Sequence, residues 1–136
     1  ASDSAVQREY IQRASDITGL GERLRDKIGT YSKGMTRKLL LSRAVMTHPK
    51  LAIIDEPTSG LDVVAAIDIR ESIRRTTTEG MAVLLSSHNM LEIEYLSDRV
   101  AIVDKGTIHD MGTPQGLKDK YGKANLEEVF VQVVKR

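Results

Sequence analysis

Two adjacent carboxylates, Asp55 and Glu56, follow directly after the aliphatic run at residues 51–54. A continuous apolar run of this length is typical of a strand that is buried on both faces. In an open α/β sheet, ligands bind beyond the carboxyl ends of the strands. At that place one carboxylate can hold Mg²⁺ through water, and its neighbour can orient and deprotonate a water nucleophile. The same pattern also fits a strand that ends in a solvated acidic turn.

Phosphate binding is indicated at two further places. Ser32, Lys33 and Gly34 stand where a helix is expected to begin, and there unpaired N–H groups and the helix dipole favour an anion. His88 lies just beyond a second aliphatic run, where a neutral imidazole can hydrogen-bond a terminal phosphate. Each feature also fits a structural role, as an ordinary capped helix in the first case and a structural histidine in the second.

These residues must be positioned by regular secondary structure. Strands are expected at residues 51–54 and 81–85, and a β-hairpin at residues 99–104 and 107–111. Helices are expected at about residues 6–17, 22–27, 62–78 and 89–96, between Ser32 and Pro49, and after the caps Thr113 and Asn125. The alternation of strands and helices predicts an α/β fold with a largely parallel sheet, a C-terminal β-hairpin and flanking helices.

The composition excludes several classes of protein. The 136 residues carry 20 Lys+Arg against 19 Asp+Glu, a net charge of +1, without the strongly basic balance of a dedicated nucleic-acid binder. The sequence has no cysteine, which excludes disulfides, thiolate metal sites and a cysteine nucleophile. The longest aliphatic stretch, at residues 81–85, is far shorter than the roughly 20 residues that a membrane helix needs.

In their order and spacing, the chemical features resemble the nucleotide-binding domain of ABC transporters, and in particular its second half. The segment 31–35, Tyr-Ser-Lys-Gly-Met, resembles the signature loop of that family, which is usually Leu-Ser-Gly-Gly-Gln. Residues 51–56 resemble the Walker B strand with the catalytic glutamate after it, residues 59–62 resemble the D-loop, and His88 resembles the switch histidine. Lys33 stands where the family usually has Gly, and Met35 where it usually has Gln.

The resemblance covers essentially the whole chain and implies a partial P-loop NTPase fold, an ABC ATPase core without its N-terminal half. It assigns residues 1–48 to part of the helical signature subdomain. Residues 49–136 would form the Walker B side of the core together with the C-terminal helices.

The resemblance also implies a role for each matching residue of the signature loop and the D-loop. Ser32 and Gly34, with Lys33 between them, would contact the γ-phosphate of ATP that is held by the opposite domain of a dimer. Asp62 would couple the two sites across that dimer.

The implied cofactors are ATP and Mg²⁺, and three further residues would act on them. Asp55 would support Mg²⁺, Glu56 would act as the general base or orient the water, and His88 would bind the γ-phosphate and the nucleophile.

The signature loop and the ending around residues 125–130 are similar to the export-type subgroup of the family. This similarity implies a subunit that lies peripherally on the cytoplasmic side of the cell membrane and hydrolyses ATP. It would drive export through a membrane-spanning partner, with a second nucleotide-binding domain as its other partner and without nucleic acid.

The phosphate-cradling Walker A loop, G-x-x-x-x-G-K-[ST], is absent from the sequence, whose one Gly-Lys pair, Gly122 and Lys123, is followed by Ala124. We therefore expect a C-terminal fragment that alone neither binds ATP tightly nor hydrolyses it. Uncovered apolar strand surface is expected to make the isolated fragment self-associate. Two alternatives remain open: an ABC-type ATPase module of a translation factor or DNA-repair protein, and a truncated, non-enzymatic regulatory module.

Overall fold

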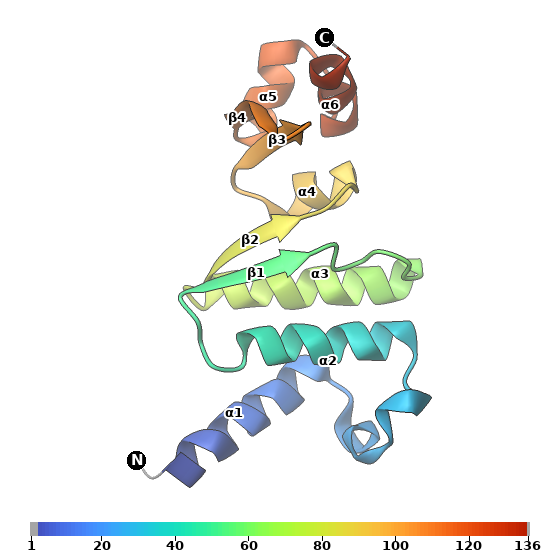
Figure 1. The fold of residues 1–136 in the computed structure, drawn as a ribbon, viewed down its shortest axis with the longest axis vertical. Helices are drawn as coiled ribbons and strands as arrows, with labels where there is room; N and C mark the ends of the chain where they lie inside the picture. The colour runs from blue at the N-terminus through green and yellow to red at the C-terminus, as the bar shows by residue number, and fades with distance from the viewer. Residues whose placement is uncertain (1–2, 136) are drawn as a thin grey trace. The chain divides into compact units, whose positions relative to one another are not determined.

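The computed structural model describes residues 3–135, and the chain divides into two compact units, Ala1–Ser86 and Ser87–Arg136 (Figure 1). The first unit contains α1 (Asp3–Thr18), the 3₁₀ helices η1 (Gly21–Arg25) and η2 (Ile28–Thr30), α2 (Lys33–Val45), β1 (Leu51–Asp55), α3 (Val63–Thr78) and β2 (Ala82–Ser86). The second contains α4 (Met90–Leu96), β3 (Val100–Asp104), β4 (Thr107–Gly112), α5 (Pro114–Tyr121) and α6 (Leu126–Val134). The α/β class, with a small parallel sheet and a hairpin near the C-terminus, is confirmed.

The first unit is built on α2 and α3, which run side by side in the same direction (Figure 1). Apolar side chains at helical spacing are buried on both helices, namely Leu41 and Val45 on α2 and Ala66, Ile69 and Ile73 on α3. The helical spacing of Ala66, Ile69 and Ile73, within the helix expected at residues 62–78, accounts for this buried face of α3. Helix α1 packs against α2 and ends before Gly19, whose φ of +59° breaks the helix as expected.

The strands β1 and β2 form a parallel pair in which Asp55 lies opposite Ser86. On one face of β1, Ala52 and Ile54 are buried, but on the other Leu51 and Ile53 are 53% and 70% exposed. Within residues 3–135 this strand is therefore buried on one face alone, because no described element covers the second face. The apolar run indicates a strand that can be buried on both faces, and the exposed second face is the uncovered apolar surface that is expected of a fragment. The second strand begins at residue 82, one residue later than expected.

Side-chain caps define the starts of the helices α2 to α6. The backbone N–H three residues after the cap donates to the cap side chain in each case; the caps are Ser32, Asp62, Asn89, Thr113 and Asn125. Half of a capping box is formed at the start of α6, where the N–H of Glu128 donates to Asn125 Oδ1 at 2.9 Å. Glu128 Oε2 accepts from the N–H of Ala124, the residue before the cap, at 3.4 Å. The short helix expected at residues 22–27 is the 3₁₀ helix η1.

The second unit combines the hairpin β3–β4 with three helices. The strands are antiparallel and turn at Lys105 and Gly106, both with positive φ, as predicted from the Lys-Gly pair. Leu117, Leu126 and Val129 are buried in this unit. The two compact units meet after Ser86, whereas the predicted functional division follows residue 48. The predicted division separates functional regions rather than compact units, and it stays a prediction.

Candidate functional site

The carboxyl end of β1 brings two carboxylates and one hydroxyl group together. Ser86 Oγ donates a hydrogen bond to Asp55 Oδ1 across the parallel pair. The backbone N–H of Glu56 donates to the carbonyl oxygen of Ser86 at 2.9 Å, so the pairing continues one residue beyond β1. The two carboxylates thus follow the end of a parallel strand, which is where α/β proteins place their ligands.

Glu56 has a left-handed backbone, with a φ of +47°. This conformation is uncommon for a residue with a side chain and costs about 1–2 kcal/mol. Pro57 follows and disfavours the right-handed helical region at Glu56, while the N–H of Ser59 donates to the Glu56 carbonyl at 3.3 Å. Backbone strain persists only where the surrounding structure enforces it, and it is concentrated at functional sites.

The beginning of α2 carries the predicted anion-binding residues. Ser32 is the N-cap, and its Oγ accepts a hydrogen bond from the N–H of Met35 at 3.1 Å. Ser32 and Lys33 are both exposed, and the first turn of α2 contains no acidic residue. Lys33 therefore places a positive charge at the positive end of a helix dipole, which favours a nearby anion and is unfavourable for the helix itself.

A close contact joins the beginnings of α2 and α3. A Cβ at Gly34 would lie only 3.1 Å from the Cβ of Ala65, so the glycine allows α2 to approach the first turn of α3. Asp62 caps α3, with Oδ1 accepting from the N–H of Ala65 at 3.0 Å. The contact brings the signature segment and the D-loop segment of the sequence to one end of the helix pair.

In the first unit, the arrowhead of β1 and the beginnings of α2 and α3 lie on the same side (Figure 1). The turn at residues 56–62 connects Glu56 directly to the cap Asp62, with the N–H of Leu61 donating to the Thr58 carbonyl at 3.1 Å. Of the predicted site residues, Ser32, Lys33, Gly34, Asp55, Glu56 and Asp62 therefore share one side of this unit.

His88 belongs to the second unit, where it is exposed and directly precedes Asn89, the cap of α4. Its expected place beside the two carboxylates stays a prediction.

The donor chemistry of Asp55 fits Mg²⁺. Its carboxylate is exposed and, among the residues that the structure describes, receives a hydrogen bond from Ser86 alone, on Oδ1. A second carboxylate oxygen is thus left for a ligand. Mg²⁺ prefers oxygen ligands and is commonly bound by one or two carboxylates together with waters and substrate phosphates.

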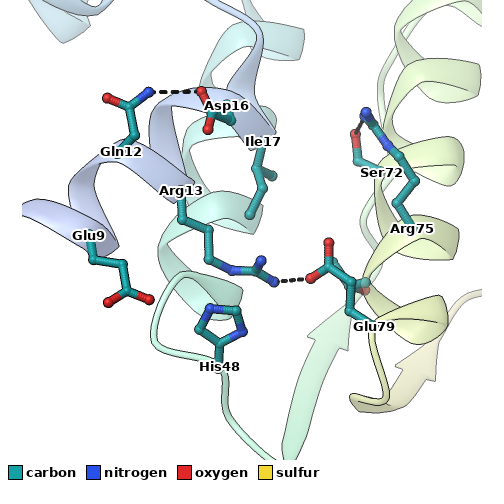
Figure 2. A pocket seen from close by; sticks show the side chains of 10 residues that line it. Glu9, Gln12, Arg13, Asp16, Ile17, His48, Ser72, Arg75 and Glu79 are labelled. Carbon is teal, nitrogen blue, oxygen red and sulfur yellow. Dashed lines mark hydrogen bonds and ion pairs between the residues drawn. The ribbon is translucent and has the colours of Figure 1, made fainter. Parts of the chain in front are cut away.

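A separate cavity of about 460 Å³ lies between α1 and the C-terminal half of α3 (Figure 2). The Arg13 guanidinium forms an ion pair with Glu79, and its Nε donates to the Val45 carbonyl at 3.5 Å. This arrangement ties α1 to the ends of α2 and α3. The lining contains none of the predicted site residues and mixes both signs of charge, including Glu9 and Arg75, so the cavity is distinct from the candidate site.

Two carboxylates of the second unit have lowered pKa values. Hydrogen bonds from Lys120 and then Tyr121 lower the pKa of Asp110 from 3.8 to about 2. A hydrogen bond from Lys118 lowers the pKa of Glu94, whose Oε2 also accepts from the N–H of Leu126 at 3.2 Å. These contacts join β4 to α5, and α4 to α5 and α6, so both groups contribute to stability.

Sequence reasoning missed Ser86. The feature that could have identified Ser86 is strand register. The last residues of two neighbouring parallel strands lie opposite one another, and Ser86 ends the strand beside Asp55. Without knowledge that these two strands pair directly, a serine at this position cannot be distinguished from an ordinary polar strand end.

Comparison with known proteins relates the chain to one family. The sequence profile of the family described as ABC transporter matches residues 3–59. An uncharacterised ABC transporter ATP-binding protein of Bacillus subtilis is 41% identical over 124 residues, which is 90% of this chain and 38% of that protein. The linearmycin resistance ATP-binding protein of the same species is 40% identical, over 90% of the chain and 40% of its own length.

A lantibiotic transport ATP-binding protein of Streptococcus pyogenes is 36% identical over 92% of the chain and 52% of its own length. A solved structure of the ATP-binding subunit of an ABC transporter has a TM-score of 0.79 and 29% identity, covering 98% of this chain and 56% of that one. The chain thus spans about two fifths to one half of the length of these relatives. Within residues 3–135, no helix is both long and apolar enough to span a membrane.

Proposed function

Because the chain is part of an ATP-binding domain of the ABC transporter family, we propose that the protein carrying it hydrolyses ATP to drive transport through a membrane-spanning partner. The observation that carries this proposal is the strained turn after β1. There Glu56 is held at a φ of +47° directly after the exposed carboxylate of Asp55. Two carboxylates at a strand end can hold Mg²⁺ and activate a water, and backbone strain at such a place is common in functional sites.

Asp55 would hold Mg²⁺ on the oxygen that Ser86 does not engage. Glu56 would accept a proton from, or orient, the water that attacks the terminal phosphate. ATP supplies the phosphoryl group and Mg²⁺ neutralises charge on its phosphates. His88 is the proposed contact of the γ-phosphate and the water.

Ser32, Lys33, Gly34 and Asp62 are proposed to face a second copy of the domain. Their position at the beginnings of two parallel helices supports this role, since both helix dipoles favour an anion on the same side. In this arrangement the residues would contact ATP that is held by the other copy, while Asp62 connects the two sites.

The residues that bind the phosphates of the nucleotide are proposed to lie outside this sequence, which contains no Walker A loop. Without a nest of backbone N–H groups and its lysine, Asp55 and Glu56 have no phosphates to act on. The isolated 136-residue chain is therefore expected neither to bind ATP tightly nor to hydrolyse it.

The uncovered face of the parallel pair supports the same view. Leu51, Ile53 and Leu84 are 53%, 70% and 60% exposed, and Asp55 and Ser86 continue the same face at its carboxyl end. A segment that covers this apolar face would lie directly beside the proposed Mg²⁺ ligand. In the isolated chain the face is expected to cause self-association.

Export is the favoured direction of transport, and the names of two relatives, a linearmycin resistance protein and a lantibiotic transport protein, support it. The protein would then lie peripherally on the cytoplasmic side of the cell membrane. An ABC-type ATPase of a translation factor or DNA-repair protein and a non-enzymatic regulatory module are the alternatives.

The test is ATP hydrolysis by the protein that carries this chain. Glu56→Gln should lower kcat by at least about a hundredfold, because a general base contributes a factor of that size, and should leave ATP binding intact. Glu71→Gln is the matched control, since Glu71 is an exposed carboxylate on α3 outside the proposed site. An unchanged kcat in Glu56→Gln would exclude Glu56 as the base, and a wild-type protein without ATPase activity would favour the regulatory module.

A further inference from the structure

Ser86 contacts both carboxylate residues of the proposed site, through two different groups. Its Oγ donates to Asp55 Oδ1. Its carbonyl oxygen accepts the backbone N–H of Glu56 at 2.9 Å. A single residue at the end of β2 therefore fixes the carboxylate of Asp55 and the backbone of Glu56.

The side-chain contact restrains a group that is otherwise free to rotate. Asp55 is exposed at the end of its strand and, within residues 3–135, the Ser86 hydroxyl is the one hydrogen-bond partner of its carboxylate. The hydroxyl donor lies beside this carboxylate, because Asp55 and Ser86 are paired in register in a parallel sheet. A carboxylate held on Oδ1 in this way presents Oδ2 in one direction.

The contact has little to contribute to the stability of the fold. Both side chains are exposed, and an exposed hydrogen bond largely replaces bonds that each group would make to water. The pairing of β1 with β2 depends on backbone hydrogen bonds, which any residue other than proline can make. The geometry thus favours a role in orienting Asp55.

We propose that Ser86 is a positioning residue for the Mg²⁺ ligand, and that its hydroxyl orients the carboxylate of Asp55 toward the ion. This inference rests on the proposed function, because it takes Asp55 as the ligand. Carboxylate ligands are commonly held by such outer hydrogen bonds, whose removal costs roughly 10–100-fold in metal affinity. The backbone contact to Glu56 is independent of the side chain, so a substitution at position 86 separates the two effects.

The test measures Mn²⁺ binding, by electron paramagnetic resonance, to the ATP-loaded protein that carries this chain. Ser86→Ala should raise the Mn²⁺ concentration at half-saturation about tenfold. Ser86→Thr, which keeps the hydroxyl group, should bind Mn²⁺ within about twofold of the wild type. Ser87→Ala is the control for loss of a neighbouring hydroxyl, since Ser87 Oγ accepts from the N–H of Asn89 at 3.0 Å instead of donating to Asp55. Far-UV circular dichroism should be the same for all variants.

Wild-type Mn²⁺ affinity in Ser86→Ala would overturn the inference, as would equal weakening in Ser86→Ala and Ser86→Thr. Failure of the wild-type protein to bind Mn²⁺ with ATP would instead refute the proposed function, and the role of Ser86 with it.

Discussion

Replacing Glu56 by glycine should relieve the strain of its backbone while removing the carboxylate on which the proposed chemistry depends. A left-handed backbone costs a residue with a Cβ about 1–2 kcal/mol, whereas glycine adopts it freely. Glycine loses more chain entropy on folding, by about 0.5–1 kcal/mol, which offsets part of this gain. At a φ of +47°, Glu56→Gly should therefore be more stable than Glu56→Ala by about 1 kcal/mol.

The comparison between glycine and alanine is the informative one, because both variants lack the carboxylate and differ in the Cβ alone. Urea unfolding of the chain, followed by circular dichroism, should show a midpoint about 0.5–1 M higher for Glu56→Gly than for Glu56→Ala. Lys105 supplies a positive control, since it has a φ of +48° in the β3–β4 turn and is not one of the proposed site residues. At position 105 the urea midpoint of the glycine variant should exceed that of the alanine variant by a similar amount.

Equal midpoints for Glu56→Gly and Glu56→Ala, together with the expected difference at Lys105, would refute the reasoning. That result would mean that the turn after β1 does not enforce a left-handed backbone. The backbone of Glu56 would then give no indication of a functional site at this turn.

Three further predictions concern packing, pH and association. Gly34→Ala gains about 1 kcal/mol of helix propensity but overpacks Ala65 at a typical cost of about 1–3 kcal/mol, so it should destabilise the chain in thermal unfolding. In an Ala65→Gly background the same change should stabilise it, and a destabilisation of equal size there would exclude the contact as the cause. The pKa of Asp110 is lowered to about 2 in the folded chain, so its contribution to stability is present above about pH 4 and is lost as the pH falls toward 2. In Asp110→Asn, the free energy of unfolding measured at several pH values should fall less steeply toward acid pH. An unchanged slope would exclude Asp110 as a source of the pH dependence. Ile53→Lys should suppress self-association of the isolated chain in sedimentation velocity at little cost in stability, because the side chain is 70% exposed; persistent oligomers would show that another surface is responsible.

Local signals in the sequence predicted most of the secondary structure. The caps Ser32, Asp62, Thr113 and Asn125 each satisfy a backbone N–H in the first turn, and this requirement depends on neighbours in the sequence alone. The apolar spacing of α3 likewise identified its buried face. Such signals need no knowledge of the distant parts of the chain.

Features that depend on contacts between distant segments were harder to predict. The contact of Ser86 with Asp55 joins residues 31 positions apart and follows from strand register. The left-handed backbone of Glu56 has no sequence marker, because glycine or asparagine is the usual sign of such a turn. The aliphatic run of β1 indicated burial on both faces, whereas the exposure of Ile53 depends on which segments lie against the sheet.

In the proposed function, one catalytic site combines Glu56 of one copy of the domain with Ser32 of another copy. The most direct test mixes two inactive variants, Ser32→Arg and Glu56→Gln, of the protein that carries this chain. In a two-fold dimer, each mixed pair would contain one site with both residues intact, so an equal mixture should recover ATP hydrolysis at about a quarter of the wild-type sites. If the mixture stays as inactive as either variant alone, while mixed dimers are shown to form, the two residues do not act across an interface and the account is contradicted.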